Sequence, residues 1–459
     1  MLQKHKAALG VDARTAASLI CLASLLVFLL GSVSALAQHD PGVRGGPANA
    51  GTAIAGLSTS QTNLFTLGSQ LFVQTASVTG SISGTRLGLG PRYNAVICSV
   101  CHNQPAVGGT SPSVNPEIAA ASDHGAKNTI PSFVVSSGPA LIARFIYQAD
   151  GVTPDGSVHS LYTITGRSDA STCSIVQDDF EGNLGKGNIS FRIPTPMFGT
   201  GLMEEIPDGT IIANMNANQT LKQGLGISGH PNYTGAGNTI TRFGWKAQEP
   251  SMLAFSAEAG NTEMGITSPL LPDERDDTSG CVLNGTPEDH PNFSATTVTA
   301  AFSQTEDISM FMRFLDQPKP GPMSMSAKNG AVQFVNIGCS LCHTPSMQTG
   351  KSSVIALSNI TANFYTDLLV HHMGPGLADN IVQGYAGGDE FRTAPLWGIG
   401  KRIFFLHDGR TTDLLQAIQD HYSLGSGTYG NSEANGVVNA FNALSTQNQQ
   451  DILNFLRSL

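Results

Sequence analysis

Two short cysteine motifs constrain this chain more than any other feature of its sequence. The pattern C-x-x-C-H occurs twice, as Cys98-Ser-Val-Cys101-His102 and as Cys339-Ser-Leu-Cys342-His343. At this spacing two thiols can form thioethers to the two vinyl groups of one haem, and the adjacent histidine can bind its iron. A thioredoxin-like redox pair does not need the histidine, and structural zinc sites pair their cysteines over shorter stretches. The sequence therefore predicts two covalently bound c-type haems, with zinc or redox chemistry as the alternatives.

The N-terminus predicts that the chain is exported. Basic residues precede a long apolar run that ends in Ala35-Leu36-Ala37, the pattern of a secretion signal. We therefore expect residues 1–37 to be a signal peptide cleaved after Ala37, and residues 38–60 to form a flexible leader. An uncleaved membrane anchor is the alternative, because the run is close to spanning length. The expected location is the periplasm, without stable insertion into a membrane after cleavage.

The composition argues against nucleic-acid binding. The formal net charge is −10 at pH 7, and no run of lysine or arginine could neutralise phosphates. Hydrophobic residues make up 40% of the chain and charged residues 13%, with 51 glycines, which favours a globular protein with long loops. Outside the two C-x-x-C-H motifs, Cys173 and Cys281 could form a disulfide in an exported protein. Buried free thiols are the alternative.

A second repeat divides the chain into halves. The segment "FRIPTPMFGTGLMEEIPDG" (191–209) resembles "FRTAPLWGIGKRIFFLHDG" (391–409), and each follows one C-x-x-C-H motif. We predict a mainly α-helical fold with long irregular loops, built from two cytochrome-c-like haem domains over 61–318 and 324–459. A loop-rich insertion is expected at about 210–300, inside the first domain. Chance recurrence of glycine and proline loops is the alternative explanation of the repeat.

Helices are expected around the second motif. The stretch "SAKNGAVQFVN" predicts a helix capped near Ser326 that runs into this motif. The end of the chain, "STQNQQDILNFLRSL", predicts a closing helix in which Thr446 and Gln449 fit a capping box. In "TTDLLQAIQDHYSL", helical spacing places His421 on the same face as Leu414 and two further apolar residues. We therefore expect His421 to point toward the core and the second haem.

Several of these segments resemble a known family, the bacterial di-haem oxidoreductases of the peroxidase type. This family is related to the di-haem cytochrome c peroxidases and to the di-haem enzyme of the methylamine pathway. The matching stretches include "GLGPRYNAVICSVCHNQPAVGG", "FRIPTPMFGTGLMEEIPD", "TDLLVHHMGPGLAD" and "FRTAPLWGIGKRIFFLHDGRTTDLLQAI", within about residues 62–459. The two FR…P…G-x-G segments and the HDGR that ends the second are more specific to the family than the cysteine motifs.

The resemblance implies a division of labour between two haems. The C-terminal haem would transfer electrons, and the N-terminal haem would reduce hydrogen peroxide with electrons from a small cytochrome or cupredoxin donor. Some related peroxidases hold a calcium ion between the domains, so calcium is a possible further cofactor here. A di-haem electron carrier without substrate chemistry is the alternative function. A thiol oxidoreductase that uses Cys173 and Cys281 is a weaker one.

The expected iron ligands are histidines. His102 and His343 are the proximal ligands predicted by the two motifs. The related peroxidases usually have methionine where this chain has His421, so we expect His421 to be the sixth ligand of the second haem. The alternatives for that position are Met373, His371 and His372. His124 lies at a distance past the first motif that matches a displaceable histidine of the related enzymes, with a surface histidine as the alternative.

A distal acid is expected near the first haem, because a proton must be shuttled between the two peroxide oxygens. Glu204 is the first candidate and Glu205 the second, since both follow the loop that should close over this haem. An exposed pair of glutamates is the alternative.

Arginines and tryptophans complete the expected haem environment. Arg192 and Arg392 open the two repeated segments, and we expect both to pair with anionic haem propionates. Trp397 is expected to pack against a haem. Trp245 is the candidate for an electron relay between the haems.

Overall fold

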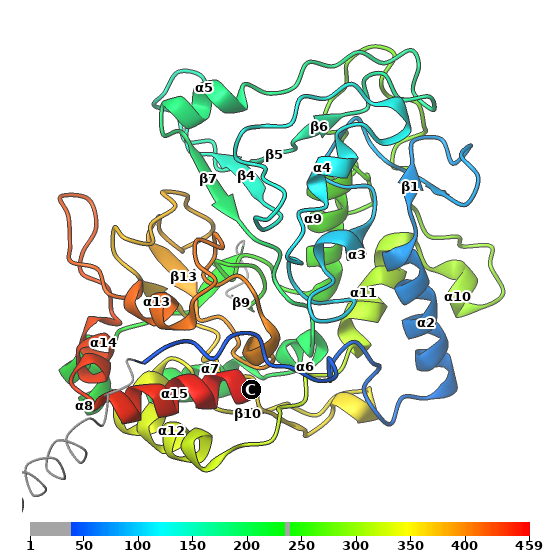
Figure 1. The fold of residues 1–459 in the computed structure, drawn as a ribbon. Helices are drawn as coiled ribbons and strands as arrows, with labels where there is room; N and C mark the ends of the chain where they lie inside the picture. The colour runs from blue at the N-terminus through cyan, green and yellow to red at the C-terminus, as the bar shows by residue number, and fades with distance from the viewer. Residues whose placement is uncertain (1–37, 235–238) are drawn as a thin grey trace, which may run out of the picture. The chain divides into compact units, whose positions relative to one another are not determined.

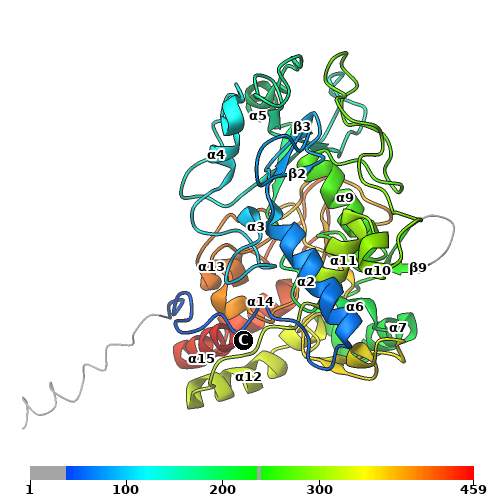
Figure 2. The ribbon, with the colours of Figure 1, turned by 90° about the vertical axis from the view of Figure 1, so that its right-hand side faces the viewer.

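The first helix after the leader packs against a helix from the middle of the chain. The computed structural model describes residues 38–234 and 239–459, so the predicted signal over 1–37 lies outside the described residues. Helix α2 (Thr59–Val73) begins at a capping box, and so does α11 (Gln304–Phe314). Both views show the two helices side by side (Figures 1 and 2). A Cβ at Gly68 of α2 would clash with the backbone of α11, so this close approach requires glycine.

A second helix pair lies beside the second C-x-x-C-H motif. Helix α12 (Met325–Asn336) packs against α15 (Thr446–Ser458), as Figures 1 and 2 show. The helices are those that the sequence predicts, but their caps are placed differently. Ser324, not Ser326, caps α12, because the Ser326 hydroxyl instead bonds to the Asp451 carboxylate of α15. Ser445 caps α15 by accepting from the Asn448 amide, so the predicted capping box was wrong by one residue.

The strands are short and form six small sheets. Strand β4 (Ile142–Phe145) is the centre of a three-stranded sheet, antiparallel to β5 (Val158–His159) and β7 (Ile189–Arg192). In the second half β12 (Val370–His372) pairs antiparallel with β13 (Glu390–Arg392). The other strands are β1 (Ala76–Ser77), β2 (Arg86–Leu87), β3 (Arg92–Tyr93), β6 (Tyr162–Thr163), β8 (Asn232–Thr234), β9 (Thr239–Thr241), β10 (Met347–Gln348) and β11 (Thr361–Ala362).

The two repeated segments share a local structure. In each, the Phe-Arg pair ends a strand, β7 in the first half and β13 in the second. A loop then leads to a glycine in the left-handed region, Gly199 (φ 67°) or Gly398 (φ 70°), which begins a short helix. These helices are α6 (Thr200–Glu204) and the 3₁₀ helix Ile399–Lys401. A shared strand, turn and helix favours a real repeat over chance recurrence, and the two-domain division stays a prediction.

The expected loop-rich insertion contains more helix than the sequence suggests. Helices α7 (Asp208–Asn216), α8 (Gln219–Leu225) and α9 (Met252–Met264) lie within it, whereas residues 265–297 form neither helix nor strand. The predicted disulfide between Cys173 and Cys281 is confirmed and ties this irregular stretch to the first half. The remaining α-helices are α3 (Cys98–Cys101), α4 (Glu117–Ala120), α5 (Phe180–Gly185), α10 (Val298–Ala301), α13 (Leu414–Gln419) and α14 (Asn435–Asn442).

Helices and long loops therefore dominate the fold, as predicted. The hydrophobic core is divided into clusters, of which one lies in the first half and one around α12, α13 and α15. A third cluster joins α2, α6 and α11 to residues that follow the second motif. Within the described residues no helix is both long enough and apolar enough to cross a bilayer.

Candidate functional site: two cavities

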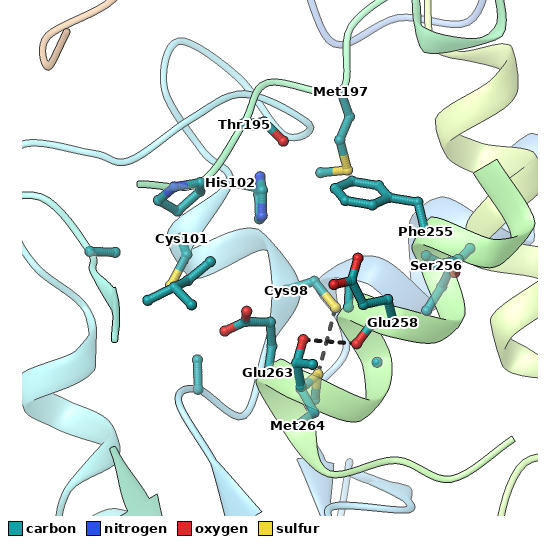
Figure 3. A pocket seen from close by; sticks show the side chains of 18 of the residues that line it. Cys98, Cys101, His102, Thr195, Met197, Phe255, Ser256, Glu258, Glu263 and Met264 are labelled. Atoms are coloured by element: carbon teal, nitrogen blue, oxygen red, sulfur yellow. Dashed lines mark hydrogen bonds between the residues drawn. The ribbon is translucent and has the colours of Figure 1, made fainter. Parts of the chain in front are cut away.

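The first C-x-x-C-H motif lies on the wall of a large cavity. Cys98–Cys101 form the single turn of α3, and His102 follows directly. The cavity has about 1320 Å³ of empty space, counting the part open to solvent, and its lining is mostly apolar. Figure 3 shows side chains of α9, among them Glu258 and Glu263, around the same space. The cavity is mostly apolar, and its acidic lining groups come from α4 and α9.

His102 is oriented so that one ring nitrogen is free. Its Nδ1 lies 3.0 Å from the carbonyl oxygen of Gly109, and since a carbonyl only accepts, Nδ1 carries the proton. Nε2 then holds a lone pair. Burial lowers the pKa of His102 to about 4, so the ring is neutral at pH 7. A metal-binding histidine has these properties: a neutral ring, oriented by a bond from its other nitrogen.

The second motif lines a second cavity in the same way. This cavity has about 1410 Å³ of empty space, including its open part, and Cys339, Cys342 and His343 line it. The Nδ1 of His343 donates to the Tyr365 carbonyl oxygen over 3.1 Å, which again leaves Nε2 free. Burial, together with the charge of His421, lowers the pKa of His343 to about 4. The two motifs thus serve two separate cavities.

His421 lines the second cavity, as the spacing of its helix predicts. It follows α13 and its Nδ1 donates to the Ala417 carbonyl oxygen over 2.6 Å. Burial lowers the pKa of His421, so its Nε2 lone pair is available at neutral pH. Leu414 and Ala417 line the cavity beside it. Burial also lowers the pKa of His407 to about 4. The second cavity therefore offers three neutral imidazoles, those of His343, His407 and His421, whereas His102 is the one histidine among the described residues that line the first.

The geometry and charge of the thiols disfavour the zinc and redox alternatives. Because the two motifs line different cavities, their cysteines cannot form one four-thiolate zinc site. Burial raises the pKa of Cys98 and of Cys101, and it raises that of Cys339 to about 12. Reactive redox pairs depend on an accessible thiolate, which these buried thiols do not provide.

Buried arginines face both cavities. In the second, Arg392 and Arg402 donate to backbone carbonyl oxygens, and no carboxylate of the described chain forms an ion pair with either. Burial lowers both pKa values to about 10, so both remain cationic at pH 7. In the first, Arg86 and Arg144 each keep a buried Nε without a hydrogen-bond partner. Such cations suit an anionic ligand, as haem propionates are. Arg192 differs, because Asp379 already holds its guanidinium.

The first cavity contains carboxyl groups that sequence reasoning missed. Burial raises the pKa of Glu117 to about 8 and also raises that of Glu263. Glu263 accepts a hydrogen bond from the Asn94 side-chain amide over 2.7 Å. Glu258 lies nearer to solvent, with 23% of its side chain exposed and one oxygen 3.8 Å from Arg144. No local motif marks these residues, since α4 and α9 bring them together only in the folded chain.

The two glutamates predicted as distal acids lie outside this cavity. Glu204 accepts from the Arg313 guanidinium over 2.6 Å and from the Met252 amide over 2.8 Å. Glu205 accepts from the Ser352 hydroxyl over 2.9 Å. Neither lines the first cavity. Both carboxylates therefore serve in contacts with other segments, which corrects their expected position.

Two further predicted residues also lie away from the cavities. His124 sits in a short 3₁₀ turn, 3.7 Å from Asp123, and does not line the first cavity. Trp397 packs against Phe364 in the core, and a Cβ at Gly199 would clash with its ring. Trp397 lines neither cavity. The structure thus gives Trp397 a packing contact with protein, and it leaves His124 half-exposed.

Trp245 occupies a position that connects the two cavities. It lines both of them, and its indole N–H donates to the Ile193 carbonyl oxygen over 2.8 Å. The amide of Ile193 in turn donates to the His407 carbonyl oxygen. The ring of His407 lies edge-on to Trp245 and stacks on Phe391, with centroids 4.1 Å apart. These aromatic rings extend from the first cavity into the second.

Comparisons with known proteins point in the same direction as this geometry. The sequence model of a family described as "Di-haem oxidoreductase, putative peroxidase" matches residues 144–459. The match starts after the first C-x-x-C-H motif and includes the second. No curated protein matches the chain.

Two solved structures match part of this chain at low similarity. Hydrazine synthase of Kuenenia stuttgartiensis is 17% identical over 36% of this chain and 56% of its own, with a TM-score of 0.21. A MauG-like protein associated with microbial copper homeostasis is 18% identical over 34% of this chain and 52% of its own, with a TM-score of 0.24. The chain thus spans little more than half the length of either structure.

Proposed function

Because the chain belongs to the di-haem oxidoreductase family, we propose that it is an exported c-type peroxidase that reduces hydrogen peroxide. The first cavity would hold the peroxide-reducing haem, and the second would hold the haem that supplies electrons. One observation carries this proposal: each C-x-x-C-H motif presents a neutral histidine, oriented through Nδ1, to its own large apolar cavity. The bound haems would supply the redox chemistry at iron.

The residues of each cavity fit a covalently held haem. Cys98 and Cys101 would form the thioethers in the first cavity, with His102 as the iron ligand. Cys339, Cys342 and His343 would do the same in the second. We propose that Arg86 and Arg144 bind propionates in the first cavity and that Arg392 and Arg402 bind them in the second, because these arginines lack full partners. Arg192 would instead hold Asp379 between the halves.

We assign the electron-transfer and peroxide-reducing roles from the histidines that line each cavity. His421 would be the sixth ligand in the second cavity, where iron held on both sides is suited to electron transfer. The first cavity has no second histidine among its described lining residues, and we propose that its iron is the one left open to peroxide. Trp245, which lines both cavities, would carry electrons between them. The electron donor would be a small cytochrome or cupredoxin, and calcium between the halves stays a prediction.

Glu258 and Glu263 take the role first given to Glu204. A distal group must take a proton from one peroxide oxygen and deliver it to the other. Glu263 is buried with a raised pKa and so keeps its proton at higher pH than an exposed glutamate. Glu258 is partly exposed at the same cavity and could exchange protons with solvent. These two residues of α9 are our candidates for the proton shuttle.

Mass spectrometry and peroxide consumption test the proposal. The protein, expressed with a c-type haem maturation system, should carry two covalent haems and consume hydrogen peroxide with a reduced cytochrome as donor. The double variants Cys98→Ala/Cys101→Ala and Cys339→Ala/Cys342→Ala should each carry one haem. A chain without covalent haem would overturn the whole proposal. Two haems without peroxide consumption would favour the electron carrier.

A further inference from the structure

Three buried ionisable side chains lie together at the wall of the second cavity. The Nδ1 of His371, on β12, lies 2.7 Å from an oxygen of Glu433, and its Nε2 lies 2.9 Å from an oxygen of Asp367. The same Nδ1 is 3.8 Å from the Sγ of Cys342. At most 7% of each of the three ionisable side chains is exposed. We call Asp367, His371 and Glu433 the acidic triad.

The hydrogen-bond partners determine the charge of His371. Both of its ring nitrogens face carboxylate oxygens, which only accept hydrogen bonds, so both nitrogens carry protons. Burial alone would lower the pKa of His371, but Cys342 and Asp367 raise it well above its usual value. With Cys342 in a thioether, the carboxylates at the two ring nitrogens would still hold both protons. The imidazole is therefore a cation held between two carboxylates.

The other two members of the triad each accept hydrogen bonds from more than one donor. Glu433 accepts hydrogen bonds from the backbone amides of Ser228 and Gly229 and from the Ser228 hydroxyl. Burial alone would raise the pKa of Glu433, but the bond from His371 and these donors lower it to about 2. Asp367 also accepts from the Leu369 amide. Two carboxylates and one imidazolium give the triad a net charge of −1.

The position of the triad is fixed by the backbone around it. His371 pairs with Phe391 in the register of β12 and β13. On its other side the ring rests on Gly229, where a Cβ would clash with it. His371 and Glu433 both line the second cavity, so the charge faces the space that Cys342 also lines. Strand pairing and packing therefore hold the triad in place at the wall of this cavity.

Among the described residues that line the second cavity, none would cancel this net charge with haem bound. Arg392 and Arg402 would be matched by the two propionates, and His343 and His421 would be neutral ligands. In the first cavity the buried carboxyl of Glu117 has a raised pKa and is protonated at neutral pH. A buried negative charge against the cysteine motif thus distinguishes the second cavity from the first.

We propose that the acidic triad lowers the reduction potential of the haem in the second cavity. Reduction adds one electron to that haem, and a buried negative charge nearby opposes it. By opposing reduction, the triad would make a haem held there a stronger electron donor to the first cavity. His371 is a positioning residue here, since it holds two carboxylates beside Cys342 without touching peroxide. The inference rests on the proposed function, in which Cys342 carries this haem.

The sign of the shift in potential tests the inference. In the purified holoprotein, Glu433→Gln and Asp367→Asn each remove one negative charge, so both should raise the potential of the second haem. At a fixed ambient potential its reduced-to-oxidised ratio should rise roughly tenfold, which is about 59 mV for one electron. His371→Gln removes the positive charge and should lower the potential. A structural role alone would not give opposite signs.

Potentiometric titration at about pH 8, followed by the absorption bands of each haem, supplies the measurement. The control is Glu204→Gln, which breaks an ion pair outside both cavities and should leave the potential unchanged. Shifts of the same sign in all three triad variants, or no shift, would overturn the inference while the proposed function stands. A wild-type chain without covalent haem would overturn the proposed function itself.

Discussion

The two cavities begin from the same five-residue pattern and differ in what faces it. Each places a neutral histidine with a free Nε2 beside two buried cysteines. The first adds carboxyl groups from α4 and α9, of which Glu117 has a pKa raised to about 8. The second adds two further neutral histidines, His407 and His421, and a charged triad. The two cysteine motifs are thus encoded locally, whereas the groups that face each motif come from distant segments.

The carboxyl groups of the first cavity should give the largest effect when they are removed. Glu263→Gln and Glu258→Gln are expected to lower kcat for peroxide by roughly 10²- to 10⁴-fold, the usual contribution of a proton shuttle. Both haems should still be attached. Steady-state peroxide consumption measures the effect, and Glu204→Gln is the matched control because that carboxylate lies outside the cavity. Equal activity in all three variants would remove α9 from the chemistry.

Removing His421 should leave the iron of the second cavity with one histidine ligand, as we propose for the first. His421→Ala removes the second imidazole, so the second haem should change from low-spin to high-spin in the electron paramagnetic resonance spectrum. His421→Met should keep it low-spin and raise its potential by roughly 0.1 V, within the range of about 0.8 V that axial ligands span. If His421→Ala leaves the spectrum unchanged, Met373, which also lines this cavity, becomes the candidate ligand.

The connection between the cavities should respond more weakly to mutation. Trp245→Phe keeps an aromatic ring but loses the hydrogen bond to Ile193, so electron transfer between the haems should slow severalfold. Stopped-flow reduction, with the two haems followed separately, measures this rate. Trp397→Phe is the control, because Trp397 is buried but lines neither cavity. An equal loss of rate in both variants would indicate general loosening of the core.

The sequence predicts those parts of this protein that depend on neighbouring residues. The cysteine motifs, α12 and α15 follow from local spacing, and the face of α13 that carries His421 follows from helical periodicity. The sequence does not predict the proposed distal acids, because α9 reaches the first motif only through tertiary packing. Glu204 follows the expected loop, but its carboxylate accepts a hydrogen bond from Arg313 and does not line the first cavity.

The sequence also does not predict which charged side chains face the second cavity. The acidic triad joins Asp367 and His371, which lie four residues apart, to Glu433 from a distant loop, and no local pattern marks Glu433 as their partner. Arg402 likewise has no sequence signal apart from its place after the repeated G-x-G, yet it faces the second cavity without a carboxylate. Residue propensity and periodicity predict helices and strands. The charge of these buried groups depends instead on the side chains that tertiary packing brings next to them.

Glu117 offers the finest test of the difference between the cavities. Its pKa is raised by burial from 4.5 to about 8, so the folded protein holds a proton that the unfolded chain releases within that interval. The free energy of unfolding should therefore fall as pH rises from about 4.5 to 8, by up to about 1.4 kcal/mol per pH unit. Glu117→Gln should flatten this dependence, because glutamine does not titrate.

Urea unfolding of the holoprotein at several pH values measures that slope. Asp420→Asn, which changes a carboxyl group outside both cavities, should retain the wild-type dependence. In the second cavity His371 is held as a cation by two carboxylates, so its raised pKa stabilises the fold at lower pH and this contribution is lost as pH rises through that value. A slope unchanged by Glu117→Gln would contradict the raised pKa of Glu117 and its burial as the source of the pH dependence.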